Sequence, residues 1–310
     1  MIQALGGIVD VGDIPAAFLA ADHDRAAAIA RLLQGLTPHP GPPRLVIRYQ
    51  RRRPAEPRRR PSHVYVGTRV WHDEDELVVH LDDAPAGARV TRDAAWIGGH
   101  SDDLNHAWQQ LFHFTVTHLL AHHHRYVLHA AGLVADNGDA YVVLGPTGHG
   151  KSTLALAAVA SGWRLLSDDL VVIRQGAVGP EASGIARRVA LPGDLGAVLE
   201  APTPPIVGDH RSRRELSVEH LSRGWFHVAV IIEVGHSSSP EGELQALCGE
   251  LAMYRVLGSF SSVTDPLLVT RFFPVAGSLC QLPRWRLGHG VEAGTRLRVA
   301  QQRLAQLAAT

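Results

Sequence analysis

The spacing of apolar and polar positions changes along the chain and divides it near residue 100. Residues 15–34 carry dense apolar runs and end at Gly35 and the breaker-rich segment TPHPGPP, a pattern that predicts one or two amphipathic helices. Residues 44–98 instead hold short β-like runs separated by Pro, Gly and acidic turns. We therefore expect residues 1–100 to form an N-terminal helical and β module whose small sheet is mostly antiparallel.

A helix is expected next, from Ser101 to the three histidines at 122–124. Ser101 is a suitable N-cap and is followed by Asp102 and Asp103. Consecutive helix residues point to different sides, so the histidines suit the C-terminal end of the helix dipole better than a shared metal ion. The inward-facing positions recur at helical spacing: Leu104, Ala107, Trp108, Leu111, Phe112, Thr115, Val116, Leu119 and Leu120.

The rest of the second domain, expected to span residues 101–310, alternates strand-like and helix-like segments, as a three-layer α/β domain requires. The dipeptide Asn137-Gly138 lies between two apolar runs and predicts a tight hairpin. The β-branched run at 225–234 predicts a central strand. Further strands are expected at 163–167, 170–174 and 284–290, and further helices at 152–160, 249–260, 265–282 and 293–308.

Charge and cysteine content exclude several classes of protein. The 30 Lys and Arg residues balance the 30 Asp and Glu residues, so no overall basic field attracts nucleic acid or an anionic membrane. No apolar run approaches the roughly 18 residues of a membrane span. The two cysteines cannot form a disulfide framework, and the N-terminus lacks the pattern of a secretion signal. We therefore expect a cytoplasmic protein that binds neither nucleic acid nor membrane.

One segment departs from this charge balance. Residues 51–60, RRRPAEPRRR, hold six arginines and two prolines between the first two expected strands. Contact with phosphate or with an acidic peptide is one interpretation, but a solvated hairpin loop is the simpler one. Because no aromatic residues are interleaved, the segment is a weak signal for nucleic acid.

The most informative motif is GPTGHGKS, which matches the phosphate-binding pattern G-x-x-x-x-G-K-[ST] at every fixed position. It follows an apolar strand and precedes a helix, the context in which backbone N–H groups face a nucleotide's phosphates. Lys151, the only lysine among 30 basic residues, supplies the cation, and Ser152 supplies a hydroxyl ligand for Mg²⁺. The expected nucleotide-binding residues are Gly145, Pro146, Thr147, Gly148, His149, Gly150, Lys151, Ser152 and Thr153.

A second group of candidate site residues is the acidic pair Asp168 and Asp169, which begins 17 residues after Lys151 at the end of a short strand. Two adjacent carboxylates allow one to hold Mg²⁺ while the other accepts a proton from an attacking hydroxyl. The alternative is an ordinary acidic turn or a helix N-cap. That alternative is weaker because the next residues, LVVIR, continue as a strand rather than as a helix.

The segment from His129 through GPTGHGKS to SDDLVVI resembles the core of the HPr kinase/phosphorylase family, and most of all its shorter relatives that phosphorylate a peptide serine in lasso-peptide gene clusters. The resemblance covers roughly residues 125–175. It implies an α/β fold with a P-loop-containing, three-layer HPr-kinase-like core, here with a small, mostly β N-terminal module. It also implies ATP and Mg²⁺ as ligands and a peptide or protein with an acceptor serine as partner. The HPr enzymes assemble as oligomers, so a homo-oligomer follows by analogy alone.

The resemblance further implies roles for single residues. Asp168 matches the family's general base and Asp169 its metal-associated partner, although the two roles could be exchanged. His129 matches the family histidine near the catalytic carboxylate, and the alternative is a core histidine that only packs. The implied catalytic residues are thus Asp168, His129 and Lys151, and the implied metal ligands are Ser152 and Asp169.

Two departures separate the chain from the bifunctional HPr enzymes. Thr153 stands where those enzymes place a Glu, as it does in the peptide-kinase relatives, and their Glu-Arg-Gly segment has no good match. Both differences argue against phosphorylase activity and against HPr as the substrate. A further cation near the γ-phosphate is expected, since phosphoryl transfer depends on charge neutralisation. The candidates, each equally well explained as a solvated charge, are Arg187, Arg188, Arg211, Arg213 and Arg214.

Three functions are consistent with these features. The first is an ATP- and Mg²⁺-dependent serine kinase for a peptide, such as the precursor of a ribosomal natural product. The second is a kinase for a carrier protein or a small hydroxylated metabolite. The third is a non-catalytic nucleotide-binding regulator, but such a regulator does not need an acidic pair beside an upstream histidine.

Overall fold

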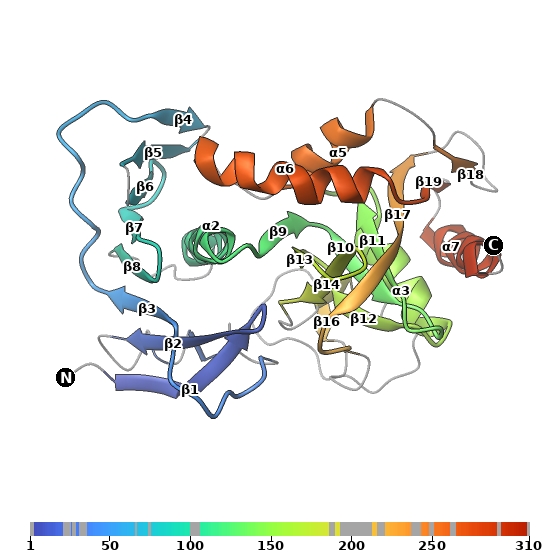
Figure 1. Cartoon of the computed structure of the whole chain (residues 1–310), viewed down its shortest axis with the longest axis horizontal. Coiled ribbons are helices and arrows are strands. Elements are labelled where there is room, and N and C mark those ends of the chain that lie inside the picture. The colour runs from blue at the N-terminus through green and yellow to red at the C-terminus, as the bar shows by residue number, and fades with distance from the viewer. Residues whose placement is uncertain are drawn as a thin grey trace. The chain divides into compact units, whose positions relative to one another are not determined.

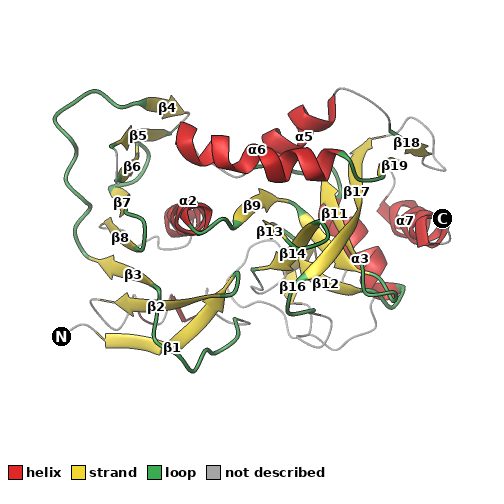
Figure 2. Cartoon of the chain, in the orientation of Figure 1, coloured by secondary structure: helices red, strands yellow, loops and turns green. Residues whose placement is uncertain are grey.

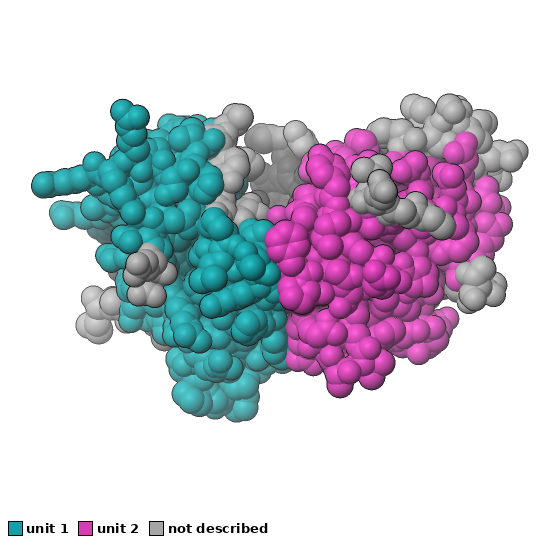
Figure 3. Space-filling view, turned by 45° about the horizontal axis from the view of Figure 1, so that its top comes forward, with its two compact units in different colours: residues 1–126, 261–272 teal, residues 127–260, 273–310 magenta. Residues whose placement is uncertain are grey.

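The computed structural model describes residues 3–20, 26, 29–30, 36–65, 67–73, 76–99, 106–185, 190–192, 213–215, 221–236, 243–247, 251–260, 265–289 and 293–308. The chain forms two compact units, which Figure 3 colours separately. The first unit comprises residues 1–126 and 261–272, and the second comprises residues 127–260 and 273–310. Each unit is built on one large sheet with helices packed on it (Figures 1 and 2), which confirms the expected mixed α/β class.

The first unit contains an 8-stranded sheet with the strand order β1-β2-β3-β8-β7-β6-β5-β4. Strand β3 runs parallel to both of its neighbours, β2 and β8, and the other adjacent pairs are antiparallel. The strands are β1 (Gln3–Val11), β2 (Ile14–Ala20), β3 (Leu45–Gln50), β4 (His63–Tyr65), β5 (Thr68–His72), β6 (Leu77–Leu81), β7 (Ala86–Val90) and β8 (Ala94–Gly99).

Strand β2 corrects the expectation of helices over residues 15–34. Ala16 and Phe18 are fully buried, whereas Leu19 is partly exposed, so burial follows the period of two that a strand imposes. Alanines on both faces of the strand present this alternation as one continuous apolar run, which fits a helix equally well in the sequence. Among the described residues beyond β2 in this stretch, helical conformation is seen at residues 26 and 29–30.

Helix α2 (His106–His122) packs on β7 and β8 of this sheet and ends, as predicted, at the first of the three histidines. The ring of Phe112 stacks on Phe18 of β2 with centroids 6.1 Å apart. Residues 101–105, including the expected N-cap Ser101, lie outside the described residues. Because α2 buries its apolar stripe against this sheet, it belongs to the first unit, whereas the sequence placed it at the start of the second domain.

The second unit contains a 9-stranded sheet in which β11, β17 and β19 run parallel. The predicted hairpin at Asn137-Gly138 is present between β10 and β11, and Gly138 has the positive φ of 87° that such a turn requires. The strand expected before this turn is split at Ala130 into β9 and β10. The strands are β9 (Tyr126–His129), β10 (Ala131–Val134), β11 (Ala140–Leu144), β12 (Arg164–Ser167), β13 (Leu170–Gln175), β14 (Pro180–Gly184), β17 (Phe226–His236), β18 (Glu243–Ala246) and β19 (Arg284–His289), with β15 (Ala190–Pro192) and β16 (Arg213–Glu215) forming a separate ribbon.

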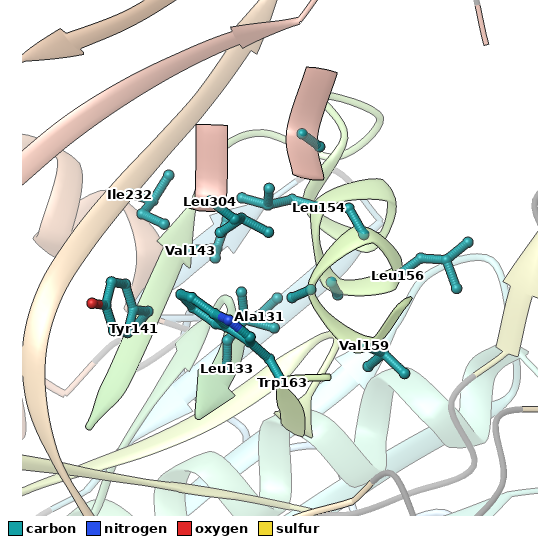
Figure 4. Packing of buried hydrophobic residues seen from close by; sticks show 14 of the residues in the cluster. Ala131, Leu133, Tyr141, Val143, Leu154, Leu156, Val159, Trp163, Ile232 and Leu304 are labelled. Atoms are coloured by element: carbon teal, nitrogen blue, oxygen red, sulfur yellow. The ribbon is translucent and has the colours of Figure 1, made fainter. Parts of the chain in front are cut away.

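Helices α3 (Lys151–Ala160) and α7 (Ala293–Ala308) share a buried core with β10, β11 and β17 (Figure 4). On β17, Ile232 and Val234 belong to this core, so Glu233 between them faces the other side of the sheet, where it meets Arg255 of α5 (Leu251–Ser259). The division between the units falls within α6 (Pro266–Cys280). Among the described residues, no helix combines the length and the apolar character needed to cross a membrane.

Candidate functional site

The segment GPTGHGKS forms the turn between β11 and α3, as the motif predicted. Gly148 and Gly150 have φ values of 83° and 96°, in the left-handed region that favours glycine. A Cβ atom on Gly145 would lie 2.7 Å from Cγ2 of Val234, so the close approach of β17 excludes a side chain there. Helix α3 begins at Lys151, and the N–H groups of its first turn have no partner within the helix. The loop and the helix start therefore form a cradle suited to an anion.

Lys151 is folded into this loop rather than extended into solvent. Lys151 is 7% exposed, and its Nζ donates to the carbonyl oxygens of Gly145 at 2.8 Å and Pro146 at 3.3 Å. The same Nζ lies 3.0 Å from Nε2 of His129, at the end of β9. The ammonium group of the only lysine is thus held by the carbonyl groups of the loop.

A hydrogen-bonded turn brings the acidic pair next to His129. The Oγ atom of Ser167 accepts from the backbone N–H groups of Asp169 at 3.3 Å and Leu170 at 3.1 Å. The carbonyl oxygen of Asp169 accepts from the N–H of Ala130 at 3.0 Å, which ties this turn to the end of β9. As a result, Oδ1 of Asp169 lies 3.3 Å from Nδ1 of His129.

Asp169, His129 and Lys151 form one continuous polar chain. An ammonium can only donate, so Nε2 of the ring accepts from Lys151 and the proton on Nδ1 points to the Asp169 carboxylate. Burial and then the charge of Lys151 lower the pKa of His129, against the opposing effect of Asp169. Burial lowers the pKa of Lys151 as well, and the carboxylates of Asp169 and Asp168 oppose that shift. The imidazole is therefore neutral at neutral pH and joins a cation to an anion.

The structure describes some, but not all, of the other predicted site residues. Ser152 and Thr153 stand in the first turn of α3, partly buried, directly after Lys151. Asp168 adjoins Asp169 and is close enough for its charge to act on Lys151. Of the arginine candidates, Arg213 and Arg214 belong to β16, whereas Arg187, Arg188 and Arg211 lie outside the described residues.

The histidines after α2 do not gather around a metal. Nε2 of His123 lies 2.9 Å from the Asp93 carboxylate, and Nδ1 of His124 lies 3.4 Å from the Tyr126 hydroxyl, so the two rings have separate partners. Within the described ranges, no three His, Cys, Asp or Glu side chains are placed to hold a metal ion.

Sequence reasoning missed Glu233, a buried carboxylate on β17 that is in register with Leu144, the last residue before the loop. Its side chain lies 3.5 Å from Nε of Arg284 and 3.7 Å from Nε of Arg255. The available signal was a single acidic residue inside the apolar run WFHVAVIIEV. A charged residue is rarely buried unless it is paired, so this position indicates an ion-pair cluster beside the loop strand.

Comparisons with known proteins leave the family of this chain open. No protein-family model and no curated protein matches the sequence. Among solved structures, the HPr(Ser) kinase/phosphatase from Coxiella burnetii is similar at 15% identity and a TM-score of 0.29, with 59% of this chain and 97% of that chain covered. Similarity of this strength establishes neither a common fold nor a common activity. Membership of the HPr kinase family and of its peptide-kinase branch stays a prediction from residues 125–175.

Proposed function

We propose that the chain is an ATP- and Mg²⁺-dependent kinase with a P-loop core of the HPr-kinase type, which transfers a phosphoryl group to a serine hydroxyl. One observation carries the proposal: Nζ of Lys151 lies 2.8 Å from the loop carbonyl of Gly145 and 3.0 Å from His129, whose other ring nitrogen lies 3.3 Å from Asp169. A nucleotide-dependent switch needs the cationic loop, whereas a kinase also needs carboxylates beside it to handle the acceptor's proton.

The residues present suit a nucleoside triphosphate and Mg²⁺. Gly148 and Gly150 shape a loop whose backbone approaches a ligand closely, and Lys151 provides the cation for the β- and γ-phosphates. The Ser152 hydroxyl and the Asp169 carboxylate are hard oxygen ligands, the kind that Mg²⁺ prefers. When bound, Mg²⁺ would neutralise negative charge on the phosphates.

In the proposed transfer, the carboxylate of Asp168 accepts the proton of the serine hydroxyl while the hydroxyl oxygen attacks the γ-phosphorus. The new O–P bond forms as the bond between the γ-phosphorus and the β,γ-bridging oxygen breaks, and ADP leaves with that electron pair. His129 orients Asp169 through Nδ1 and Lys151 through Nε2. Because His129 contacts Asp169, we assign the metal-associated role to Asp169 and the role of the base to Asp168.

We further propose a peptide as the acceptor, specifically the precursor of a ribosomally made natural product. Support comes from the resemblance of residues 125–175 to the kinases of lasso-peptide clusters and from Thr153, which stands where the bifunctional HPr enzymes carry Glu. A carrier protein or a small hydroxylated metabolite would use the same chemistry, so the acceptor class is an outcome of the test.

Mass spectrometry of candidate acceptors incubated with the protein and Mg-ATP tests the proposal. We expect one added phosphate on a serine of a peptide, no phosphate on the matching peptide with Ala at that serine, and no transfer by Lys151→Ala. Transfer to a carrier protein or metabolite instead would support the kinase proposal and reject the proposal of a peptide acceptor. Binding of Mg-ATP without transfer to any of the three classes would reject the kinase in favour of a nucleotide-dependent regulator.

A further inference from the structure

The sheet of the first unit has an outer face whose cross-strand register aligns basic and aromatic side chains. Ile47 and Ile97 are buried on the opposite face, so the residues next to them along the strands, Arg48 and Trp96, point outward. Two guanidinium groups flank the Trp96 ring, that of Arg48 at 5.8 Å and that of Arg89 at 5.9 Å from its centroid. The register continues this row across β3, β8, β7, β6 and β5 as Arg48, Trp96, Arg89, Val78 and Trp71.

A second row, two residues further along the strands, is shaped to receive the arginine-rich loop between β3 and β4, which Figure 1 shows running from one edge of these strands toward the other. Gly98 and Gly87 are direct partners in this row. A Cβ atom on Gly98 would collide with the carbonyl oxygen of Arg52, so the absence of a side chain there lets the loop backbone lie directly on the sheet. A Cβ atom on Gly87 would lie 2.5 Å from the carbonyl oxygen of Val79 and 2.7 Å from Cδ2 of His80, so this glycine is required mainly by the neighbouring strand β6.

Two side chains of the sheet donate hydrogen bonds to the backbone of the loop. Nε2 of the fully buried His80 donates to the carbonyl oxygen of Pro54 at 3.0 Å. Nε1 of Trp71 donates to the carbonyl oxygen of Arg59 at 2.9 Å. Residues 51–60 are mostly exposed to solvent, as expected, but they do not form a hairpin loop, because β3 and β4 are not neighbours in the sheet. These two hydrogen bonds hold the segment against the sheet, where it forms one wall of a groove.

Between this wall and the first row lies a groove of about 700 Å³, within the range of ligand-binding clefts. Its three acidic side chains already have arginine partners: Glu56 pairs with Arg69 at 2.6 Å, Asp73 with Arg59 at 3.3 Å, and Glu76 with Arg89. Two lining arginines, Arg53 and Arg58, are exposed and pair with no acidic side chain in the part of the chain that is described. Arg53 and Arg58 are therefore the lining guanidinium groups that these carboxylates do not engage.

The chemistry of the groove favours a peptide over a nucleic acid. Single-stranded nucleic acid binds by stacking its bases on accessible aromatic rings. Here Trp71 is 1% exposed and Trp96 is flanked by two guanidinium groups, so neither ring offers a stacking platform. Isolated carboxylates on an extended chain can instead reach Arg53 and Arg58 one at a time, each as a bidentate pair.

From this arrangement we infer that the groove binds a short extended peptide segment carrying Asp or Glu side chains. The segment is held by Arg53 and Arg58 above the row of Trp96 and Val78. Because hydrogen bonds to His80 and Trp71 hold the loop backbone on the sheet, binding has to order mainly the exposed side chains of Arg53 and Arg58. This binding is separate from phosphoryl transfer and needs no nucleotide.

Fluorescence anisotropy with a labelled peptide of alternating Gly and Glu tests this inference at fixed salt. The double substitution Arg53→Ala with Arg58→Ala should weaken binding roughly ten-fold or more. The matched control, Arg52→Ala with Arg60→Ala, removes the same charge from exposed positions of the same loop that do not line the groove, and should bind as the unaltered protein does. A peptide of alternating Gly and Gln should bind the unaltered protein at least as weakly as the Glu peptide binds the first double variant.

Three results would overturn the inference: equal affinity of the two double variants, equal affinity for the Glu and Gln peptides, or displacement of the Glu peptide by a single-stranded oligonucleotide that binds more tightly. Circular dichroism and thermal unfolding check that both double variants stay folded. Lys151→Ala should bind the Glu peptide normally, so failure of the kinase proposal and failure of this one are distinguishable.

Discussion

The Nζ atom of Lys151 and the Nε2 atom of His129 lie 3.0 Å apart, and the contact requires a neutral imidazole. Nε2 accepts from the ammonium only while the ring lacks its second proton. Protonation would place two cations in contact and would change the hydrogen bonding of Asp169 at the same time. The charge state of His129 therefore controls whether the lysine and the acidic pair keep their arrangement.

Lys151 should be protected from chemical labelling by nucleotide. It is the only lysine, so an amine-acylating reagent can modify its Nζ and the α-amino group of the chain, and the α-amino group serves as an internal reference. With Mg-ATP at about ten times its Kd, the labelling rate of Lys151 should fall to roughly one-tenth, since only unoccupied protein reacts. Peptide mass spectrometry measures both sites. An unchanged Lys151 rate at nucleotide concentrations that calorimetry shows to be saturating would mean that the nucleotide binds elsewhere.

The plot of kcat against pH should have an acid limb, a fall in rate at low pH, because His129 becomes protonated. Burial and Lys151 lower the pKa of this ring, so the active neutral form persists throughout neutral pH and is lost only below the ordinary value of about 6.5. His129→Gln keeps a polar side chain but cannot take up a proton, so its activity should be lower overall while lacking that limb. Rate profiles of kcat from pH 5 upward, roughly the range in which histidine titrates, provide the comparison. A limb with its midpoint above the ordinary histidine pKa, or one retained in His129→Gln, would count against the assignment.

Glu233→Gln should destabilise the second unit. The carboxylate is 10% exposed beside Arg284, which is 8% exposed, so the substitution removes a negative charge from beside a buried guanidinium. The expected loss in the free energy of unfolding is about 3 kcal/mol, measured by chemical denaturation. Arg255→Met is the control: that side chain is 46% exposed, and its pair with Glu233 should contribute less than about 1 kcal/mol. Equal effects of the two substitutions would show that Arg284 does not depend on Glu233.

His118, on α2, should make the first unit sensitive to acid. Burial, followed by the charges of His122 and His72, lowers its pKa to about 3. The unfolded chain, with the ordinary value near 6.5, takes up the proton first, so stability is fully present above about pH 6.5 and declines as the pH falls toward the folded-state pKa. The decline attributable to this residue is at most about 1.4 kcal/mol per pH unit. Denaturation midpoints of the unaltered protein and His118→Gln should therefore converge on acidification, and parallel curves would exclude a role for His118.

Local sequence patterns predicted the elements that build the loop site. The hairpin at Asn137-Gly138, helix α3 after the loop and the strand β17 were all predicted, because each depends on residues that are neighbours in the chain. The proximity of His129 to the acidic pair was anticipated only through the resemblance of residues 125–175. The contact itself depends on tertiary structure that no local pattern encodes: β9 lies beside β13, and the N–H of Ala130 donates to the carbonyl oxygen of Asp169.

Features that depend on strand register could not be predicted. Strand β2 was expected as a helix because its apolar residues occupy both faces. Gly98 is unremarkable in the sequence, and only its position on β8 next to the carbonyl oxygen of Arg52 explains why the arginine-rich loop can lie on the sheet. The role of Glu233 also depends on the neighbouring strands: it is in register with Leu144 of β11 and Arg286 of β19, and Nε of Arg284 on β19 lies 3.5 Å from its carboxylate.

The measurement that tests the central claim most directly is the rate of phosphate transfer to the acceptor serine by Asp168→Asn, compared with the unaltered protein at saturating Mg-ATP. An amide at position 168 has nearly the shape of the carboxylate but cannot accept the serine's proton, so transfer should fall at least about a hundred-fold, the typical contribution of a general base. The affinity for Mg-ATP should change little. Transfer by Asp168→Asn at the rate of the unaltered protein would contradict the assignment of this site as a serine kinase that uses Asp168 as its base.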